Sequence, residues 1–104
     1  MIPCICIDNS NCPIDYPLPS QWIEKNKEYH IIDVKYVVKS ETLGFKLLEK
    51  KSEKFFPYMF YKSDRFVFEE KYLSELLNMI NNSEELKEEE RVKVKRILED
   101  GILV

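Results

Sequence analysis

Cys4, Cys6, Cys12 and His30 are the side chains in this sequence best suited to binding a metal ion. Thiolates and imidazoles hold structural zinc, and four of them complete its tetrahedral shell. The common zinc sites place roughly two to four residues between paired cysteines, so that one tight turn supplies both ligands. Cys4 and Cys6 are instead separated by one residue, as on one face of a strand. We therefore predict buried thiols and no metal site.

His30 is the only histidine, so any histidine-dependent acid–base chemistry has to use it. Cys12, His30 and Asp33 have the side-chain types of a catalytic triad. However, His30 and Asp33 are three residues apart and face opposite sides of a strand unless a bulge intervenes. The sequence has no nucleophile elbow, phosphate-binding loop or metalloprotease motif. We predict a protein that is not an enzyme and needs no cofactor.

Cations and aromatic residues are interleaved between residues 46 and 65. Barrels that bind single-stranded nucleic acid use this combination, because bases stack on aromatic rings and cations neutralise phosphates. Residues 29–68 carry eight Lys and Arg against five Asp and Glu, a local net charge of +3, although the whole chain has a net charge of -3. Single-stranded nucleic-acid binding is therefore the alternative function. The basic residues that would serve it are Lys46, Lys50, Lys51, Lys54 and Lys62.

A long loop over residues 9–22 contains Pro13, Pro17 and Pro19, which favour an extended chain without regular pairing. Loops of this length are uncommon and often carry function. Small barrels bind peptides in the groove between such a loop and an aromatic strand. Protein interaction is therefore the predicted function. The expected groove residues are Tyr16, Trp22, Tyr58, Tyr61 and Arg65.

Strand patterns fill the first two thirds of the chain. Residues 2–7 are apolar on both faces, which predicts a central strand covered on both sides. Residues 29–39 alternate, with His30 and Val34 on one face, while Tyr29 and Ile31 suggest a bulge near the start. Shorter strands are expected at 43–47, 55–61 and 66–68, with a tight turn or 3₁₀ segment at 63–65.

The periodicity becomes helical after residue 68. An amphipathic helix is expected over 69–81, and Asn82 with Glu85 forms a capping box for a second helix that ends near Gly101. A hairpin within 91–104 is the rival interpretation, because residues 91–95 alternate and Asp100-Gly101 is a turn signal. We prefer the helix, since the Glu-rich run before it is a poor strand.

The order of strands followed by helices predicts a mainly β fold. We expect a small antiparallel barrel of about five strands over 1–68, with one or two helices in 69–104 packed on it as part of one domain. There are only two glycines, so Asn and Asp must occupy the tight turns, and Asn26 is a candidate for a left-handed backbone.

Several segments carry a family resemblance. They are Cys6-Ile7-Asp8-Asn9 before the long loop, Trp22-Ile23, Tyr29-His30-Ile31, Leu43-Gly44-Phe45-Lys46-Leu47 and Ser63-Asp64-Arg65-Phe66. They resemble a group of small, mostly uncharacterised phage and mobile-element proteins with a Src-homology-3-like barrel. Asn26 stands where these proteins tend to carry glycine. The resemblance implies a barrel and a mobile-element origin, which suits a composition typical of AT-rich genes, and it implies no chemistry.

Location and partners follow from the cysteines and the apolar segments. An odd number of cysteines without an export signal predicts reduced thiols and a cytoplasmic protein. No apolar run is long enough to span a membrane, so no membrane partner is expected. A protein partner is expected, and nucleic acid remains open. The helix over 69–81 and the apolar residues 102–104 also leave self-association open.

Overall fold

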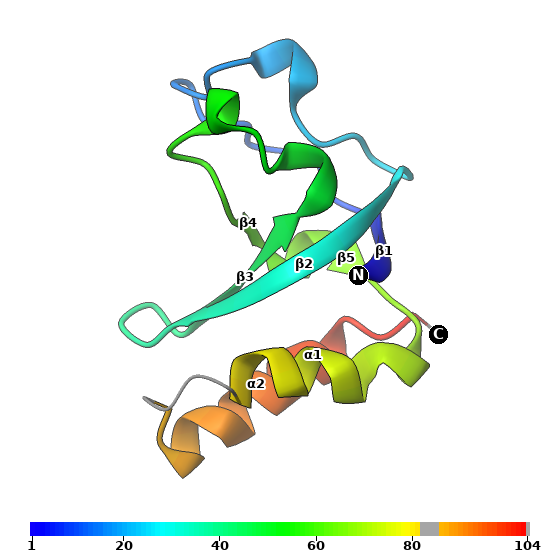
Figure 1. Ribbon diagram of the computed structural model, residues 1–104, viewed down its shortest axis with the longest axis vertical. Helices are drawn as coiled ribbons and strands as arrows, with labels where there is room; N and C mark the ends of the chain where they lie inside the picture. Colours follow the sequence, from blue (N-terminus) through cyan, green and yellow to red (C-terminus); the bar gives the residue numbers. More distant parts are fainter. Residues whose placement is uncertain (82–85, 104) are drawn as a thin grey trace.

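Five antiparallel strands form one sheet, in the order β4-β3-β2-β1-β5, in the computed structural model, which describes residues 1–81 and 86–103 (Figure 1). The strands are β1 (Ile2–Cys6), β2 (Glu28–Val37), β3 (Thr42–Leu47), β4 (Tyr61–Lys62) and β5 (Phe66–Val67). The helices are α1 (Leu73–Asn81) and α2 (Glu88–Asp100). Short 3₁₀ segments are η1 (Pro19–Gln21), η2 (Leu48–Lys50), η3 (Glu53–Phe55), η4 (Ser63–Arg65) and η5 (Glu70–Tyr72). The antiparallel sheet followed by two helices is confirmed, in a mixed α/β fold.

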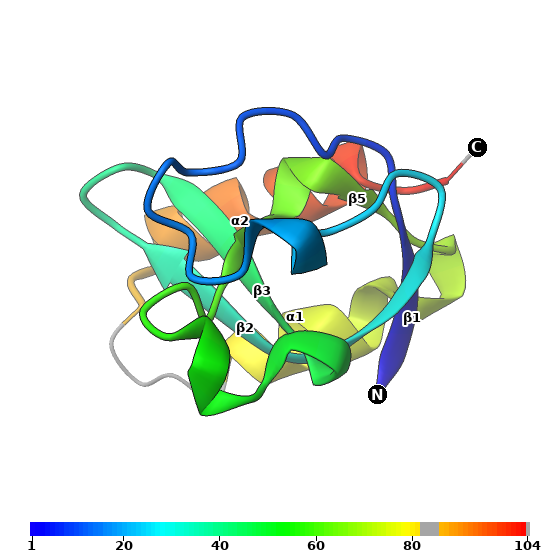
Figure 2. The ribbon, with the colours of Figure 1, turned by 90° about the horizontal axis from the view of Figure 1, so that it is seen from above.

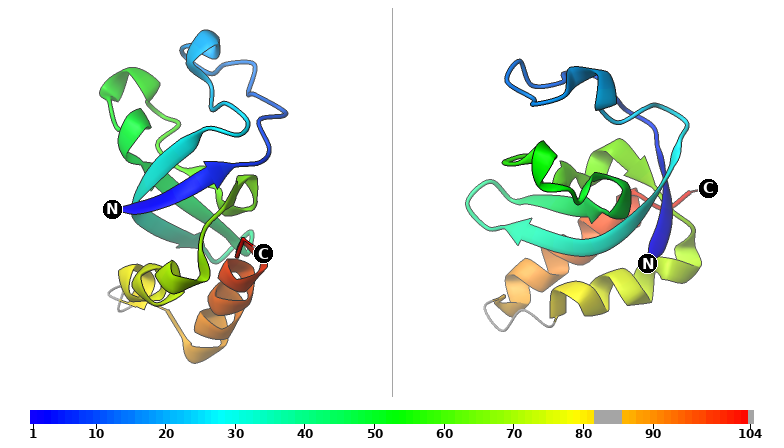
Figure 3. Two further views of the ribbon diagram at one scale, coloured as in Figure 1. Left: turned by 90° about the vertical axis from the view of Figure 1, so that its right-hand side faces the viewer. Right: turned by 45° about the horizontal axis from the view of Figure 1, so that its top comes forward.

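The edge strands β4 and β5 are joined by η4 alone, and this short link makes the sheet curl. Between Lys62 and Phe66 the chain can span at most about 14 Å. The outer strands of a flat five-stranded sheet would lie about 19 Å apart. The strands therefore wrap around the core (Figure 3). Among the described residues no backbone pairing joins β4 to β5, so the sheet is not closed and the expected barrel is not confirmed.

β2 changes the face that it buries partway along its length. Its pairing with β3 shifts register between Ile31 and Asp33. Tyr29 and Ile31 are buried before the shift, and Val34 is buried after it. One extra residue reverses the alternation of side chains, which is the effect of a bulge. The suggested bulge is confirmed, and the expectation that His30 shares a face with Val34 is wrong.

β1 is an internal strand that is covered on one face only. It pairs with β2 on one side and with β5 on the other. Ile2, Cys4 and Cys6 are buried, whereas Ile5 and Ile7 are 36% and 43% exposed. A curled sheet has one interior, and the other face of β1 meets solvent. The prediction that both faces are covered is therefore wrong.

The strand expected over 55–61 is mostly irregular. Phe55 lies in η3, and only Tyr61 and Lys62 pair with β3. Pro57 interrupts the segment, since proline cannot donate a backbone hydrogen bond to a ladder. The alternating aromatic residues here serve packing rather than strand pairing, because Phe55 is buried while Phe56 is 69% exposed.

α1 and α2 lie side by side on one side of the sheet (Figure 1). Leu76, Ile80, Val94 and Leu98 belong to the same hydrophobic core as the strands. The helix preferred for residues 91–100 is confirmed, and the rival hairpin is wrong. The expected capping box at Asn82 and Glu85 lies outside the described residues.

The end of α2 returns the chain to β5. Gly101 caps α2 with φ at −91°, so the expected glycine is present without a left-handed backbone. The N–H of Phe68 donates to the carbonyl of Gly101 (3.0 Å), and the N–H of Leu103 donates to the carbonyl of Phe68 (2.7 Å). Phe68 and Ile102 form a parallel bridge. Residues 101–103 therefore lie beside the chain just after β5.

Two long connections, residues 7–27 and 48–60, occupy the side of the sheet opposite the helices (Figure 1). Figure 2 views the protein from this side and shows both connections in front of the sheet. They supply most of the residues of the site described next.

The turn before β2 provides a test of the backbone. Asn26 has φ at 71°, and its N–H donates to the carbonyl of Cys6 at 2.7 Å. We expect Asn26→Ala to lower the free energy of unfolding by about 1 kcal/mol, because alanine lacks the short polar side chain that lets asparagine tolerate the left-handed backbone. Asn26→Gly should be close to neutral. Urea denaturation measures both, and equal losses in the two variants would contradict this account of the turn.

Candidate functional site

A cavity of about 230 Å³ lies between the long loop and β4. Its lining residues are Pro13, Trp22, Tyr58, Phe60, Tyr61, Lys62 and Arg65, and we call it the aromatic pocket. Four of the five groove residues expected from the sequence line this pocket. Trp22 follows η1 in the first long connection, and Tyr58 lies in the second. Both meet Tyr61 of β4 and Arg65 of η4 at this cavity.

Tyr16, the fifth expected groove residue, is buried behind the aromatic pocket. It is 2% exposed. Its ring meets Trp22 edge-on, with centroids 4.8 Å apart, and lies 5.5 Å from the ring of Tyr58. Such aromatic contacts stabilise a preferred geometry beyond simple burial. Tyr16 therefore supports the pocket wall and does not line it.

A buried hydrogen bond joins the long loop to β4. The hydroxyls of Tyr16 and Tyr61 are 2.8 Å apart. Burial raises the pKa of both phenols above the ordinary tyrosine value. The Tyr61 ring also lies 5.5 Å from the Trp22 ring. This bond therefore fixes the loop to β4 in the interior of the protein.

Trp22 and Arg65 hold the same short stretch of the long loop. The indole N–H of Trp22 donates to the carbonyl of Asn9 (2.8 Å). One guanidinium nitrogen of Arg65 donates to the carbonyls of Ser10 (2.7 Å) and Asp8 (3.3 Å). The guanidinium also lies 5.4 Å from the centre of the Trp22 ring, within cation–π range. Arg65 is thus a rigid part of the pocket wall.

Tyr58 completes the outer rim of the aromatic pocket. Its hydroxyl donates to the carboxylate of Asp15, and this hydrogen bond raises the pKa of Tyr58. The polar atoms of Trp22 and Tyr58 are therefore bonded within the protein. The pocket offers a ligand aromatic faces, with the cation of Lys62 at its edge. This arrangement suits an apolar or planar group that lies next to a negative charge.

The five lysines of the nucleic-acid alternative occupy different environments. Lys50 is buried, its ammonium donates to the carbonyl of Gln21, and burial lowers its pKa. Lys46 is half-buried in β3, while Lys51 and Lys54 are exposed. Of the five, only Lys62 lines the aromatic pocket.

The cysteines lie in apolar surroundings. Burial raises the pKa of the Cys4 thiol to about 12 and also raises that of Cys6. Both thiols are therefore protonated at neutral pH and unsuited to nucleophilic attack. Cys12 is half-buried. Across residues 1–81 and 86–103, no three His, Cys, Asp or Glu side chains gather closely enough to hold a metal ion.

His30 is paired with carboxylates on the outer face of β2. Its Nδ1 lies 2.6 Å from a carboxylate oxygen of Glu49, and its Nε2 lies 3.7 Å from Glu28. Burial opposes ionisation of Glu49, but hydrogen bonds from His30 outweigh it and lower the pKa of Glu49. The Asp33 carboxylate accepts from the N–H of Val34 instead. The bonds described for these side chains do not link His30 to Asp33.

Pro13 and Phe60 line the aromatic pocket but were not among the residues expected there. Gly44 indicated that another group packs closely against β3, because a glycine inside a strand often marks a close neighbour. That neighbour is Phe60. A Cβ at Gly44 would lie 3.1 Å from the Cβ of Phe60. Pro13 had no comparable signal, since its position depends on how the whole loop folds back.

Comparisons of the chain with protein-family models, curated proteins and solved structures found no match. Neither α1 nor α2, the α-helices of the described residues, is long and apolar enough to cross a membrane.

The buried phenol pair can be tested by a double-mutant cycle. Tyr61→Phe leaves the Tyr16 hydroxyl without a partner, so we expect it to lower the free energy of unfolding by about 1–2 kcal/mol. Tyr16→Phe should cost a similar amount. The double variant should lose little more than either single variant, because no unpaired hydroxyl remains. Strictly additive losses in urea denaturation would rule out a direct bond.

The same pair predicts a loss of stability at alkaline pH. In the unfolded chain both phenols ionise near pH 10, whereas the fold raises their pKa and favours the neutral form. Their contribution is therefore complete below about pH 10 and falls as the pH rises further. We expect the free energy of unfolding to decrease between about pH 10 and pH 12 more steeply in the wild type than in the double Tyr→Phe variant. Identical slopes would contradict this assignment.

Proposed function

We propose that this protein is a non-enzymatic interaction module that binds an extended segment of a partner protein at the aromatic pocket. The observation that carries the proposal is the convergence of Trp22, Tyr58 and Tyr61 on one cavity from distant parts of the chain. The buried hydrogen bond between Tyr16 and Tyr61, the hydrogen bond from Trp22 to the loop and the ring contacts hold these side chains in place before any ligand arrives. A preorganised site loses less entropy on binding.

The size of the pocket supports a side-chain anchor rather than a cofactor. Its volume of about 230 Å³ is below the range of roughly 300–1,000 Å³ that small-molecule sites occupy. Peptide recognition by small domains commonly places single apolar side chains in aromatic-lined pockets. An aliphatic, aromatic or proline side chain of a partner fits this description.

We also propose that the curled sheet is a Src-homology-3-like barrel left open between β4 and β5, with residues 7–27 as the wall of the groove. The short η4 link between the edge strands supports this. A phage or mobile-element origin and a cytoplasmic location belong to the same proposal. They rest on the composition and on the free cysteines.

A second candidate is single-stranded nucleic-acid binding. The exposed cation of Lys62 beside aromatic faces favours it, because a base can stack while its phosphate meets the ammonium. The buried position of Lys50 weakens it. We therefore place it second.

Trp22 is the only tryptophan, so its fluorescence reports directly on the aromatic pocket. We expect short peptides selected from a random displayed library to shift the Trp22 emission of the wild-type protein on titration. Tyr58→Ala should weaken these peptides by about tenfold or more, since it removes one wall of the pocket.

Phe56→Ala is the matched control, because Phe56 is an exposed aromatic residue that does not line the pocket. It should bind the selected peptides as the wild type does. If the library yields no peptide that changes Trp22 fluorescence, or if both variants lose affinity equally, the aromatic pocket is not the binding site.

A further inference from the structure

Lys62 stands where three cavities meet. One is the aromatic pocket, and a second, of about 160 Å³, lies over the outer face of β2 and β3 and shares Phe60, Tyr61 and Lys62 with it. The third, of about 210 Å³, shares Thr42, Leu43 and Lys62 with the second. The three cavities therefore adjoin one another around β4, and we call them together the Lys62 groove.

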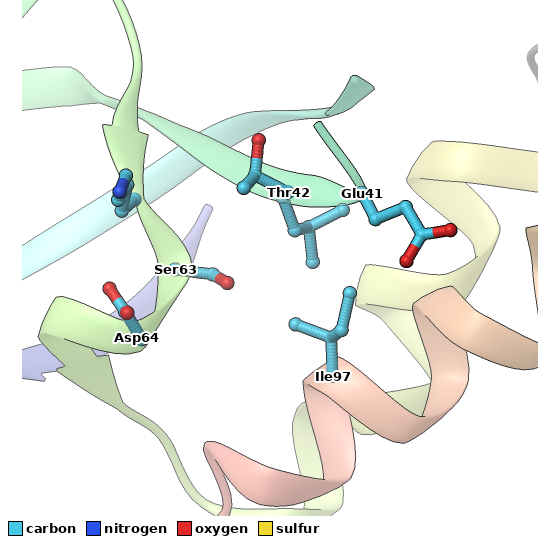
Figure 4. A pocket seen from close by; sticks show the side chains of 7 residues that line it. Glu41, Thr42, Ser63, Asp64 and Ile97 are labelled. Atoms are coloured by element: carbon cyan, nitrogen blue, oxygen red, sulfur yellow. The ribbon is translucent and has the colours of Figure 1, made fainter. Parts of the chain in front are cut away.

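The far end of the Lys62 groove lies against α2. Figure 4 shows Ile97 pointing from α2 into the cavity, with Thr42 above it and Ser63 and Asp64 beside it. This end combines an apolar floor with hydroxyl and carboxylate groups at the rim. The Lys62 groove thus includes lining residues from the long connections, from β4 and from α2, an arrangement that suits an extended chain better than a single side chain.

The charged side chains that line the Lys62 groove are three cations, Lys35, Lys62 and Arg65, and two carboxylates. Within the described part of the chain, Lys62 and Lys35 form no ion pair, and Lys35 lies over the Phe60 ring at 5.8 Å. Glu41, one of the two acidic residues in the lining, is already paired with Lys93 of α2. Asp64 is the other. The groove therefore presents cations whose counter-charge a ligand can supply.

We infer that the Lys62 groove binds an acidic, extended peptide segment of a partner protein. An apolar side chain of the segment enters the aromatic pocket, and its carboxylates meet the ammonium groups of Lys62 and Lys35. This inference rests on the proposed function and adds the chemistry of the partner. The charge of the surrounding sequence agrees, since residues 29–68 hold eight basic against five acidic side chains in a chain of net charge -3. Complementary charge selects a partner and orients it in the groove.

The test uses peptides from the random displayed library, selected on the full-length wild-type protein, with Trp22 fluorescence as the readout. We expect the selected peptides to be enriched in Asp and Glu near an apolar residue. Replacing those acids by Asn and Gln should weaken binding by about tenfold. Lys62→Glu should weaken the acidic peptides to a similar extent and remove the preference for acid over amide.

Lys51→Glu is the matched control, because Lys51 is exposed and lines none of the three cavities. It changes the net charge equally and should leave affinity within about twofold of the wild type. Equal losses in the two variants would overturn the inference, since they would indicate a general charge effect.

The remaining outcomes separate this inference from the proposed function. Selected peptides that shift Trp22 fluorescence without any acidic preference would leave the proposed function intact and overturn the acidic partner. A library that yields no binder would overturn both. An oligothymidine that shifts Trp22 fluorescence, loses affinity as salt rises and is sensitive to Lys62→Glu would assign the groove to nucleic acid instead.

Discussion

η4 links β4 to β5 across the open side of the sheet, and most of the architecture depends on this short connection. A chain of this length cannot bridge the edges of a flat sheet, so the strands curl around one interior. The curl explains why β1 buries Ile2, Cys4 and Cys6 yet exposes Ile5. It also determines where the aromatic pocket forms, because Tyr61 precedes the link and Arg65 ends it.

The long connections would be costly to order without specific contacts, since fixing each residue of a loop loses conformational entropy. The contacts that offset this cost are few and directed. Arg65 and Trp22 hold residues 8–10, Tyr16 bonds to Tyr61, and Tyr58 bonds to Asp15. The same contacts that order the loop shape the pocket. Loop stability and ligand affinity should therefore respond together to substitutions at these positions.

Sequence periodicity was informative wherever burial alternates regularly along the chain. β3 is such a case, since Leu43, Phe45 and Leu47 all point into the core as their spacing indicates. Over 55–61 the alternation predicted a strand that is mostly absent, because aromatic residues can also alternate in irregular chain that packs on a sheet. It also misled at His30, because a bulge reverses the faces of β2 and a single sequence reveals only a hint of it.

The groove residues were found because loop length and aromatic content are visible in a sequence. The sequence did not show which of these residues line the pocket and which support it from behind. Tyr16 and Lys50 are buried by contacts with residues far away in the chain, Tyr61 and Gln21 respectively. No local pattern distinguishes a buried tyrosine or lysine from an exposed one when its partner is defined only by the folded loop.

The chain that follows α2 has a consequence for how the protein behaves at high concentration. A free sheet edge offers unpaired backbone groups to other molecules and invites intermolecular strand pairing. Residues 101–103 bond to both the N–H and the carbonyl of Phe68 and so shield the chain at the β5 end of the sheet. The β4 edge is two residues long and carries the exposed ammonium of Lys62. Both edges are thus poor templates for growth, so a curled sheet that stops short of closure can still resist assembly into fibrils.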